Sequence, residues 1–464
     1  MKAKRNNSGK LVQSRAESSC DPVLDLQNIY PKLDSSIVNT RLVEIEAFNS
    51  LPKYLSSSLD FYSDYSVTEF TYLPDSFLYL DLEPVKFVGN EDPVELDFRN
   101  DLDKQISLIP LIGHTIIKKL SLEINNQEVT NTLASKYAEE AFLKTVTNFS
   151  KEKQDIYLNG AHPFLNDTAN GALTLDNDSI QYNNRKNVVL GGFKIATPFL
   201  HGVFQCKKLF PPGVPFKLSL YLNSPEYCLL SGEPVPEGTR YDLRVKRASL
   251  FVMRVTLSPT ETLRQERRLS KKGANYPFVK YVPGSFVAKP GTIQPTIPIL
   301  NFEERLPQMI HCYVRQKDSL ENIGKDPFFF DTQRIKEIYL TLDGKKLPYD
   351  IGYTSVRKEV EKNLLLLNLQ QNYRRGLNQV DKYNFTNGYG IFSFSLLSFP
   401  ASLGCDVCFV RPHQHGMISL NIVFKEELEK HHVISWFMEF PTVLHMEPNR
   451  KIAMLPLPIQ HSGT

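Results

Sequence analysis

This chain of 464 residues has little cysteine and no long apolar run. Its six cysteines are unevenly spaced, which favours reduced thiols in a cytosolic or nuclear setting over a disulfide framework. No segment approaches the roughly 18 consecutive apolar residues that a membrane-spanning helix needs, so we expect no transmembrane segment. Residues 1–16 are basic and polar without an apolar core, so we expect no secretory signal.

The sequence also lacks a strong charge of one sign and the common catalytic motifs. A net charge of +3 is too balanced for a dedicated nucleic-acid binder. A glycine-rich phosphate loop, a G-x-S-x-G elbow and an H-E-x-x-H zinc motif are missing, and no acidic spacing singles out a catalytic pair. We therefore predict a protein that is not an enzyme, with no catalytic residues, no cofactor-binding residues and no cofactor.

One predicted loop contains potential metal ligands, namely Cys405, Cys408, His413 and His415. Thiolates and imidazoles of this kind bind zinc tetrahedrally, but the C-x2-C-x4-H-x-H spacing is tighter than in common zinc modules. We therefore assign no metal site, and a structural zinc stays an alternative that metal analysis of the purified protein would decide. Other histidines are interpreted as core or surface residues, namely His114, His201, His431 and His432.

Aromatic residues and proline are abundant, with 29 Phe, 21 Tyr and 30 Pro. They favour strands and turns over helices, and a hydrophobic content of 41% is enough for a core. Strand-like patterns, several of them alternating between apolar and polar, cover residues 77–82, 120–124, 216–222, 243–257, 338–342, 418–424 and 433–440. The sequence therefore predicts an all-β chain.

A short repeat links the two halves of the chain. Residues 118–126 resemble residues 336–344, and each is a strand pattern that ends in a turn pair, Asn-Asn or Asp-Gly. Each also precedes a stretch with helical spacing, over residues 133–149 and 355–374. The shared order of strand, turn and helix predicts two related β-sandwiches.

The β pattern is confined to residues 66–258 and 276–452, which we expect to form the two sandwiches. Residues 1–65 are predicted to be an N-terminal arm, either a flexible or partly helical tail or an arm that orders on neighbouring subunits or nucleic acid. Residues 259–275 are predicted to be a connector, and residues 453–464 a C-terminal tail. The basic residues of the arm are Lys2, Lys4, Arg5, Lys10 and Arg15.

The connector is rich in basic residues, namely Arg264, Arg267, Arg268, Lys271 and Lys272. Glu261 and Glu266 dilute their charge, so a solvated linker is the interpretation we prefer. A basic patch that faces nucleic acid is the alternative.

Several segments of the chain follow one another in an order typical of a known family. In the first half these are residues 120–130 with Tyr137, Glu140 and Leu143, then residues 200–205, 209–214 and 241–255. In the second half they are Tyr276-Pro277, Leu306-Pro307, Val314, residues 326–328 and 342–344, Leu347-Pro348, Tyr383, Gly388-Tyr389, residues 392–394 and 416–424, Phe440 and Asn449-Arg450.

In this order the chain resembles the double jelly-roll major capsid proteins of Maverick/Polinton-type elements and adinto-like viruses, which also occur as capsid-like proteins in animal genomes. The resemblance covers about residues 68–452. It departs from the family before residue 65, where no counterpart is found. It also departs after Phe394, where Phe399-Pro400 and the Cys/His loop replace an acidic, proline-containing turn.

The resemblance implies two tandem jelly-roll β-sandwiches with short helices in the connecting loops. It also implies a structural protein of the virion, in which homotrimers form pseudo-hexameric capsomers of an icosahedral shell. The expected partners are other copies of the chain, neighbouring capsomers, and penton and minor capsid proteins, with nucleic-acid contact by the basic arm as a further possibility. Assembly would take place in the host cytoplasm or nucleus.

Three other interpretations stay open at this stage. A jelly-roll module that binds a ligand, as lectins do, would place aromatic and acidic residues around a shallow site. A cupin-like metalloenzyme needs His and Glu ligands on inward-facing strands, whereas Glu426 and Glu427 follow His413 and His415 only after an apolar strand. A domesticated host copy of a capsid protein is the third.

Overall fold

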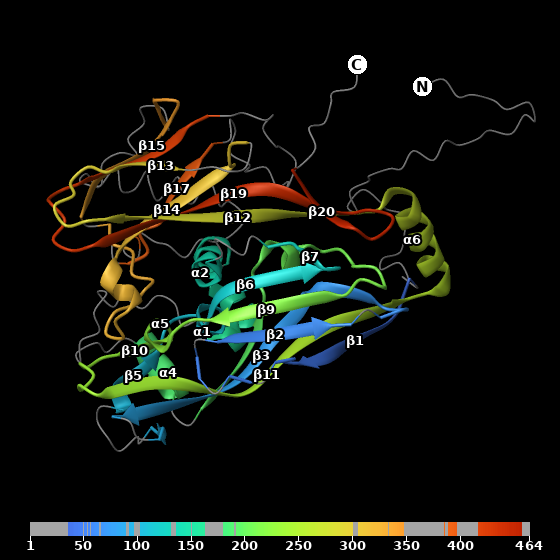
Figure 1. Ribbon diagram of the computed structural model, residues 1–464, viewed down its shortest axis with the longest axis horizontal. Coiled ribbons are helices and arrows are strands. Elements are labelled where there is room, and N and C mark those ends of the chain that lie inside the picture. The colour runs from blue at the N-terminus through green and yellow to red at the C-terminus, as the bar shows by residue number, and fades with distance from the viewer. Residues whose placement is uncertain are drawn as a thin grey trace, which may run out of the picture.

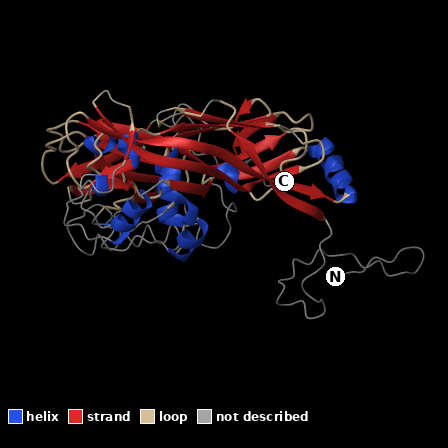
Figure 2. Ribbon diagram, turned by 90° about the horizontal axis from the view of Figure 1, so that it is seen from below, coloured by secondary structure: helices blue, strands red, loops and turns tan. Residues whose placement is uncertain are grey.

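The computed structural model describes residues 36–456 except for residues 50, 53, 56, 65, 90–91, 97–102, 131–135, 150, 163–179, 190–191, 300–304, 333, 348–384, 386–387 and 397–415. Its strands form two sandwiches that lie side by side (Figure 1). Within the described residues, the longest helix that lies outside the sandwiches is α6 (Pro259–Lys272), at one end of the molecule and apart from the other helices (Figure 2).

The first sandwich packs a five-stranded sheet against a four-stranded one. The larger sheet contains β1 (Ile37–Glu46), β11 (Thr239–Leu257), β3 (Phe70–Val88), β4 (Val94–Glu95) and β8 (Phe193–Pro198). The smaller sheet contains β2 (Ser58–Ser63), β9 (Phe216–Leu222), β6 (Ile117–Ile124) and β7 (Gln127–Glu128). Leucines from both sheets meet in one core, such as Leu80 of β3 and Leu218 of β9.

The second sandwich is built in the same way. One sheet contains β12 (Ala274–Ala288), β19 (His432–Met446), β14 (Met309–Gln316), β17 (Phe392–Ser395) and β20 (Ile452–Pro456). The other contains β13 (Thr296–Ile299), β18 (Ile418–Phe424), β15 (Ile335–Leu342) and β16 (Lys345–Leu347). The all-β prediction is confirmed, because every strand pattern identified in the sequence lies within one of these strands.

Shorter elements fill the space between and beside the sheets. They are β5 (Ile106–Leu108) with its partner β10 (Leu229–Ser231), and the helices α1 (Ile112–Thr115), α2 (Tyr137–Asn148), α3 (Lys151–Tyr157), α4 (Ile180–Val189) and α5 (Pro225–Cys228). Helix α2 confirms the helix predicted over residues 133–149, with a later start. The helix predicted over residues 355–374 lies outside the described residues.

The internal repeat corresponds to two equivalent hairpins. In the first, β6 pairs with β9 and turns through Asn125 and Asn126 into β7; in the second, β15 pairs with β18 and turns through Asp343 and Gly344 into β16. All four turn residues have positive φ, at 51°, 60°, 49° and 76°, which matches the twist of a two-residue hairpin loop. Both β6 and β15 also shift register by one residue after their first residue. A bulge at the same place in both hairpins indicates that the repeat extends beyond the matched residues.

The prediction that residues 1–65 form an arm is wrong for β1 and β2. Strand β1 pairs with β11 along its whole length, and β2 pairs with β9. Each partner is more than a hundred residues away in the sequence, so local periodicity gives little sign of the pairing. The prediction that residues 453–464 form a tail is likewise wrong for the part that lies in β20, which pairs with β19 as far as Pro456. The limits proposed for the two sandwiches and the connector stay predictions.

A tight contact between the sandwiches gives a test of their packing. Gly202 of the first half lies against β12 of the second, and a Cβ atom there would be 2.4 Å from the carbonyl oxygen of Val279. We expect Gly202→Ala to lower the free energy of unfolding by about 1–3 kcal/mol through overpacking, measured by denaturant titration at fixed protein concentration. Gly324→Ala is the control, because its Cβ meets only the Asn322 side chain, at 3.2 Å. Equal stability of the two variants would contradict close packing at this contact.

Candidate functional site

Helix α2 belongs to the first half of the chain but packs in the core of the second. Phe142 stacks on Phe328 with ring centroids 4.3 Å apart and meets the edge of Phe330 at 5.8 Å. Ala138, Leu143 and Val146 of the same helix lie in the same apolar cluster. The two sandwiches therefore share a core instead of meeting at a wet surface.

A buried ionic network lies within this shared core. Glu139 of α2 accepts hydrogen bonds from the Arg315 guanidinium and from the Tyr313 hydroxyl, both on β14. Burial by itself raises the pKa of Glu139, but Arg315 and Lys136 outweigh it, so the net pKa is below the usual carboxyl value. Arg315 also donates to the carbonyl oxygen of Pro327 at 2.8 Å. Glu139 is therefore ionised, and its ion pair with Arg315 links the two halves of the chain.

A second polar network continues from α2 to β19. Lys144 donates to Glu140 at 2.7 Å and lies 4.2 Å from the ring centroid of Tyr281. The Tyr281 hydroxyl donates to Glu439 at 2.6 Å, and His311 Nε2 lies 2.8 Å from the same Glu439 oxygen. Burial raises the pKa of Glu439, but the contacts with His311 lower it by more than burial raises it. The net pKa of Glu439 is therefore below the usual carboxyl value. The carboxylates of Glu140 and Glu439 thus both bind partners within the protein, and such an arrangement stabilises packing.

The histidines of interest are distributed in the way expected of core and surface residues. His114 is buried between the Tyr137 and Thr197 hydroxyls, each 3.1 Å from a ring nitrogen, and burial lowers its pKa to about 3. Burial likewise lowers the pKa of His201 to about 4. His431 is exposed, and His432 Nδ1 lies 2.9 Å from the Lys430 carbonyl oxygen.

Metal and membrane sites receive no support from the described part of the chain. Cys405, Cys408, His413 and His415 lie outside the described residues. Within those residues, no three potential ligands gather closely enough to hold a metal ion, and Cys206, Cys228 and Cys312 are buried free thiols. None of the described helices is long and apolar enough to cross a membrane.

The surface feature that stands out is α6, which occupies most of the predicted connector. Ser258 is the N-cap and accepts a hydrogen bond from the backbone N–H of Glu261, with Pro259 at the first helical position. Gly273 ends the helix with φ of 68°. The S-x-x-E capping box, with proline at its first helical position and glycine after its end, is the sequence signal that our linker interpretation overlooked.

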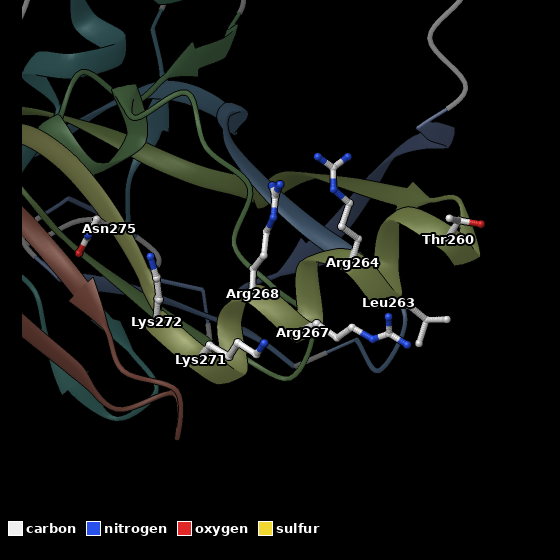
Figure 3. Close-up of a pocket in the computed structure, with 9 residues that line it drawn as sticks. Thr260, Leu263, Arg264, Arg267, Arg268, Lys271, Lys272 and Asn275 are labelled. Carbon is white, nitrogen blue, oxygen red and sulfur yellow. The ribbon is translucent and has the colours of Figure 1, made fainter. Parts of the chain in front are cut away.

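An open groove of about 810 Å³ follows the outer side of α6. It is lined mainly by cationic side chains, namely Arg264, Arg267, Arg268, Lys271 and Lys272 (Figure 3). The side chains of Arg264 and Arg268 extend from the helix in the same direction. The groove therefore offers a row of positively charged groups, with Leu263 as the one large apolar side chain in its lining.

Comparison with solved structures identifies the fold. The mavirus major capsid protein covers 97% of this chain and 96% of its own length, with a TM-score of 0.58 and 10% identity. A protein in the structure of the Sputnik virophage covers 99% and 98%, with a TM-score of 0.60 and 11% identity. The faustovirus major capsid protein covers 93% and 92%, with a TM-score of 0.53 and 8% identity. This chain has the double jelly-roll fold of viral major capsid proteins.

Sequence comparison adds nothing to this, since no family model and no curated protein matches the double jelly-roll chain. Agreement in fold over nearly the whole length at about a tenth of identical residues means that the packing pattern is retained while most side chains differ. In this chain, the two networks around α2 join the jelly rolls.

The Glu139 network makes a prediction about stability. Glu139→Gln keeps the shape but leaves the Arg315 guanidinium buried without its counter-ion. We expect the free energy of unfolding to fall by about 3–5 kcal/mol, the usual effect of breaking a buried pair, as measured by denaturant titration. Glu261→Gln on the exposed helix α6 is the control and should change little. A wild-type stability in Glu139→Gln would show that Arg315 finds another partner.

The same pair makes a prediction about pH. Because the folded-state pKa of Glu139 is lowered, its stabilisation is complete above the unfolded-state carboxyl pKa and is lost as pH falls through the folded value. Glu439 contributes with the same sign. We therefore expect thermal stability to decrease on the acid side, and the decrease to be shallower in Glu139→Gln. An equal loss of thermal stability at acid pH in the wild type and in Glu139→Gln would contradict an origin of the pH dependence in Glu139.

Proposed function

We propose that the chain is a major capsid protein, a structural protein and not an enzyme, which assembles into pseudo-hexameric homotrimers that tile an icosahedral shell. The observation that carries the proposal is the full-length agreement of fold with viral major capsid proteins. Two similarly built jelly rolls per chain support it, because three such chains present six similar units around one axis. Neighbouring capsomers, penton proteins and minor capsid proteins would be its partners in the virion.

The edge of the first jelly roll is a suitable place for contact between copies. Strand β1 lies at the end of its sheet, and it exposes Ile37, Val38 and Leu42 to 48%, 64% and 47%. A long edge strand with exposed apolar side chains tends to associate unless it is covered. We propose that a second copy of the chain covers it in the trimer.

The finer assignments belong to the same proposal. We assign the chain to the Maverick/Polinton and adinto-like lineage on the order of its sequence motifs. We place the first jelly roll within residues 66–258 together with β1 and β2, and the second within residues 276–452. Assembly would take place in the cytoplasm or nucleus of the host cell.

The native mass of the purified protein tests the capsomer proposal. We expect a trimer of about three times the chain mass of 53.1 kDa, or larger closed particles, by light scattering behind a sizing column. A monomer whose mass does not change with concentration would contradict the proposal and favour a ligand-binding module. Val38→Lys with Leu42→Lys should shift the trimer toward monomer, because two buried charges would oppose contact at β1.

The matched control is Val67→Lys with Ile156→Lys, which alters side chains that are 80% and 83% exposed and lie outside the edge strand. This variant should remain trimeric. Loss of the trimer in both variants to the same extent would show that β1 has no special part in association.

A further inference from the structure

Helix α6 separates its charges onto two sides. Its outward residues are Thr260, Leu263, Arg264, Arg267, Arg268 and Lys271, all exposed. Both of its acidic residues, Glu261 and Glu266, are half-buried on the side that faces the protein. On the outer side, the dilution of charge inferred from the sequence is therefore limited to Arg264, which pairs with Glu261.

Both acidic residues already have basic partners. The Glu261 carboxylate accepts from Arg264 at 3.1 Å, while the Glu261 backbone N–H donates to the N-cap Ser258, and Glu266 pairs with Arg450 at 3.1 Å. Within the described residues, no ion pair joins Arg267, Lys271 or Lys272 to a carboxylate. The outer side of α6 thus has positive charge that the fold leaves uncompensated.

Further basic residues gather at the same end of the molecule. Lys208 lines a second groove together with Arg268, and its ammonium donates to the Asn275 carbonyl oxygen at 2.8 Å. The described chain begins at Ser36, whose carbonyl oxygen accepts from the backbone N–H of Ser258, directly before α6.

We infer that the outer side of α6 binds the phosphate backbone of nucleic acid. Cations placed three and four residues apart form a row along a helix that rises about 1.5 Å per residue, and a row of cations fits a row of phosphates. Arginine in particular offers a planar pair of donors to phosphate oxygens. The inference rests on the capsid function proposed above in one respect, since it requires this end of each chain to face the interior of the shell.

Two other anionic partners fit the helix less well. An amphipathic helix that lies in a membrane buries a broad apolar face, whereas the outer side of α6 exposes Leu263 alone among its large apolar residues. A stable protein partner usually requires several large apolar or aromatic side chains at the centre of the contact, whereas Leu263 is the one such side chain that lines this groove. Sequence-independent binding of phosphates needs neither feature.

Binding of the full-length protein to a fluorescent 20-base-pair DNA duplex, measured by anisotropy over a range of salt concentrations, tests the inference. We expect affinity to fall steeply with salt, and the slope of log K against log salt to decrease by about one for each phosphate-binding cation removed. Arg267→Gln with Lys271→Gln should therefore lower the slope by about two. Arg267→Lys with Lys271→Arg should retain it, because the charges remain.

The matched control is Lys289→Gln with Lys345→Gln, which removes the same charge from exposed sites on the second jelly roll. One of these sites follows the far end of β12, about 50 Å from α6 by strand length. An unchanged slope in Arg267→Gln with Lys271→Gln, or an equal loss in the control, would overturn the inference. Tighter binding to phosphatidylserine vesicles or to polyglutamate than to the duplex at the same salt would do so as well.

The native mass of the wild-type protein, measured together with its binding to the duplex, distinguishes a failure of this inference from a failure of the capsid proposal. A wild-type monomer that binds the duplex with the expected slope supports phosphate binding by α6 while contradicting the capsomer. A wild-type trimer without salt-dependent binding contradicts the role of α6 and leaves the capsomer supported.

Discussion

The ion pair between Glu139 of α2 and Arg315 of β14 is the interaction on which the arrangement of the two jelly rolls depends. Both side chains are nearly closed to water, so a displacement of α2 that broke the pair within the core would leave two buried charges without partners. The stacked ring of Phe142 fixes the same helix against Phe328. Apolar packing supplies the attraction, and the ion pair selects one orientation, because charges in a medium of low polarity tolerate little displacement.

A fixed orientation matters for a chain with an internal repeat. The hairpin of β6 and β7 and the hairpin of β15 and β16 share their turn geometry and the position of their bulge. Two similar units held rigidly within one chain can occupy similar positions in a larger assembly, as a pseudo-hexameric trimer requires. The segment that follows the first hairpin includes α2, which enters the core of the second jelly roll.

In helix α6, the fold decides how the charged residues of the segment are distributed between its inner and outer sides. Counted along the sequence, its basic and acidic residues partly cancel. The helix turns Glu261 and Glu266 toward Arg264 and Arg450 and leaves the other cations facing outward. A segment with five basic and two acidic residues therefore presents most of its positive charge on one side, and the charge of that side is the property that a partner meets.

The sequence by itself determined the strands, because the alternation in segments such as β9 and β18 reports which face is buried, and turn residues with positive φ mark where hairpins end. It also indicated the repeat and the double jelly-roll family, since these depend on the order of local motifs. Only the tertiary structure decided that β1 and β2 belong to the first sandwich, that α2 joins the second core through Glu139 and Arg315, and that α6 sorts its charges. The first two features arise from contacts between residues far apart in the chain, which local periodicity does not encode. Periodicity can group the cations of α6 on one side of a helix, but only the packed fold decides which side faces outward.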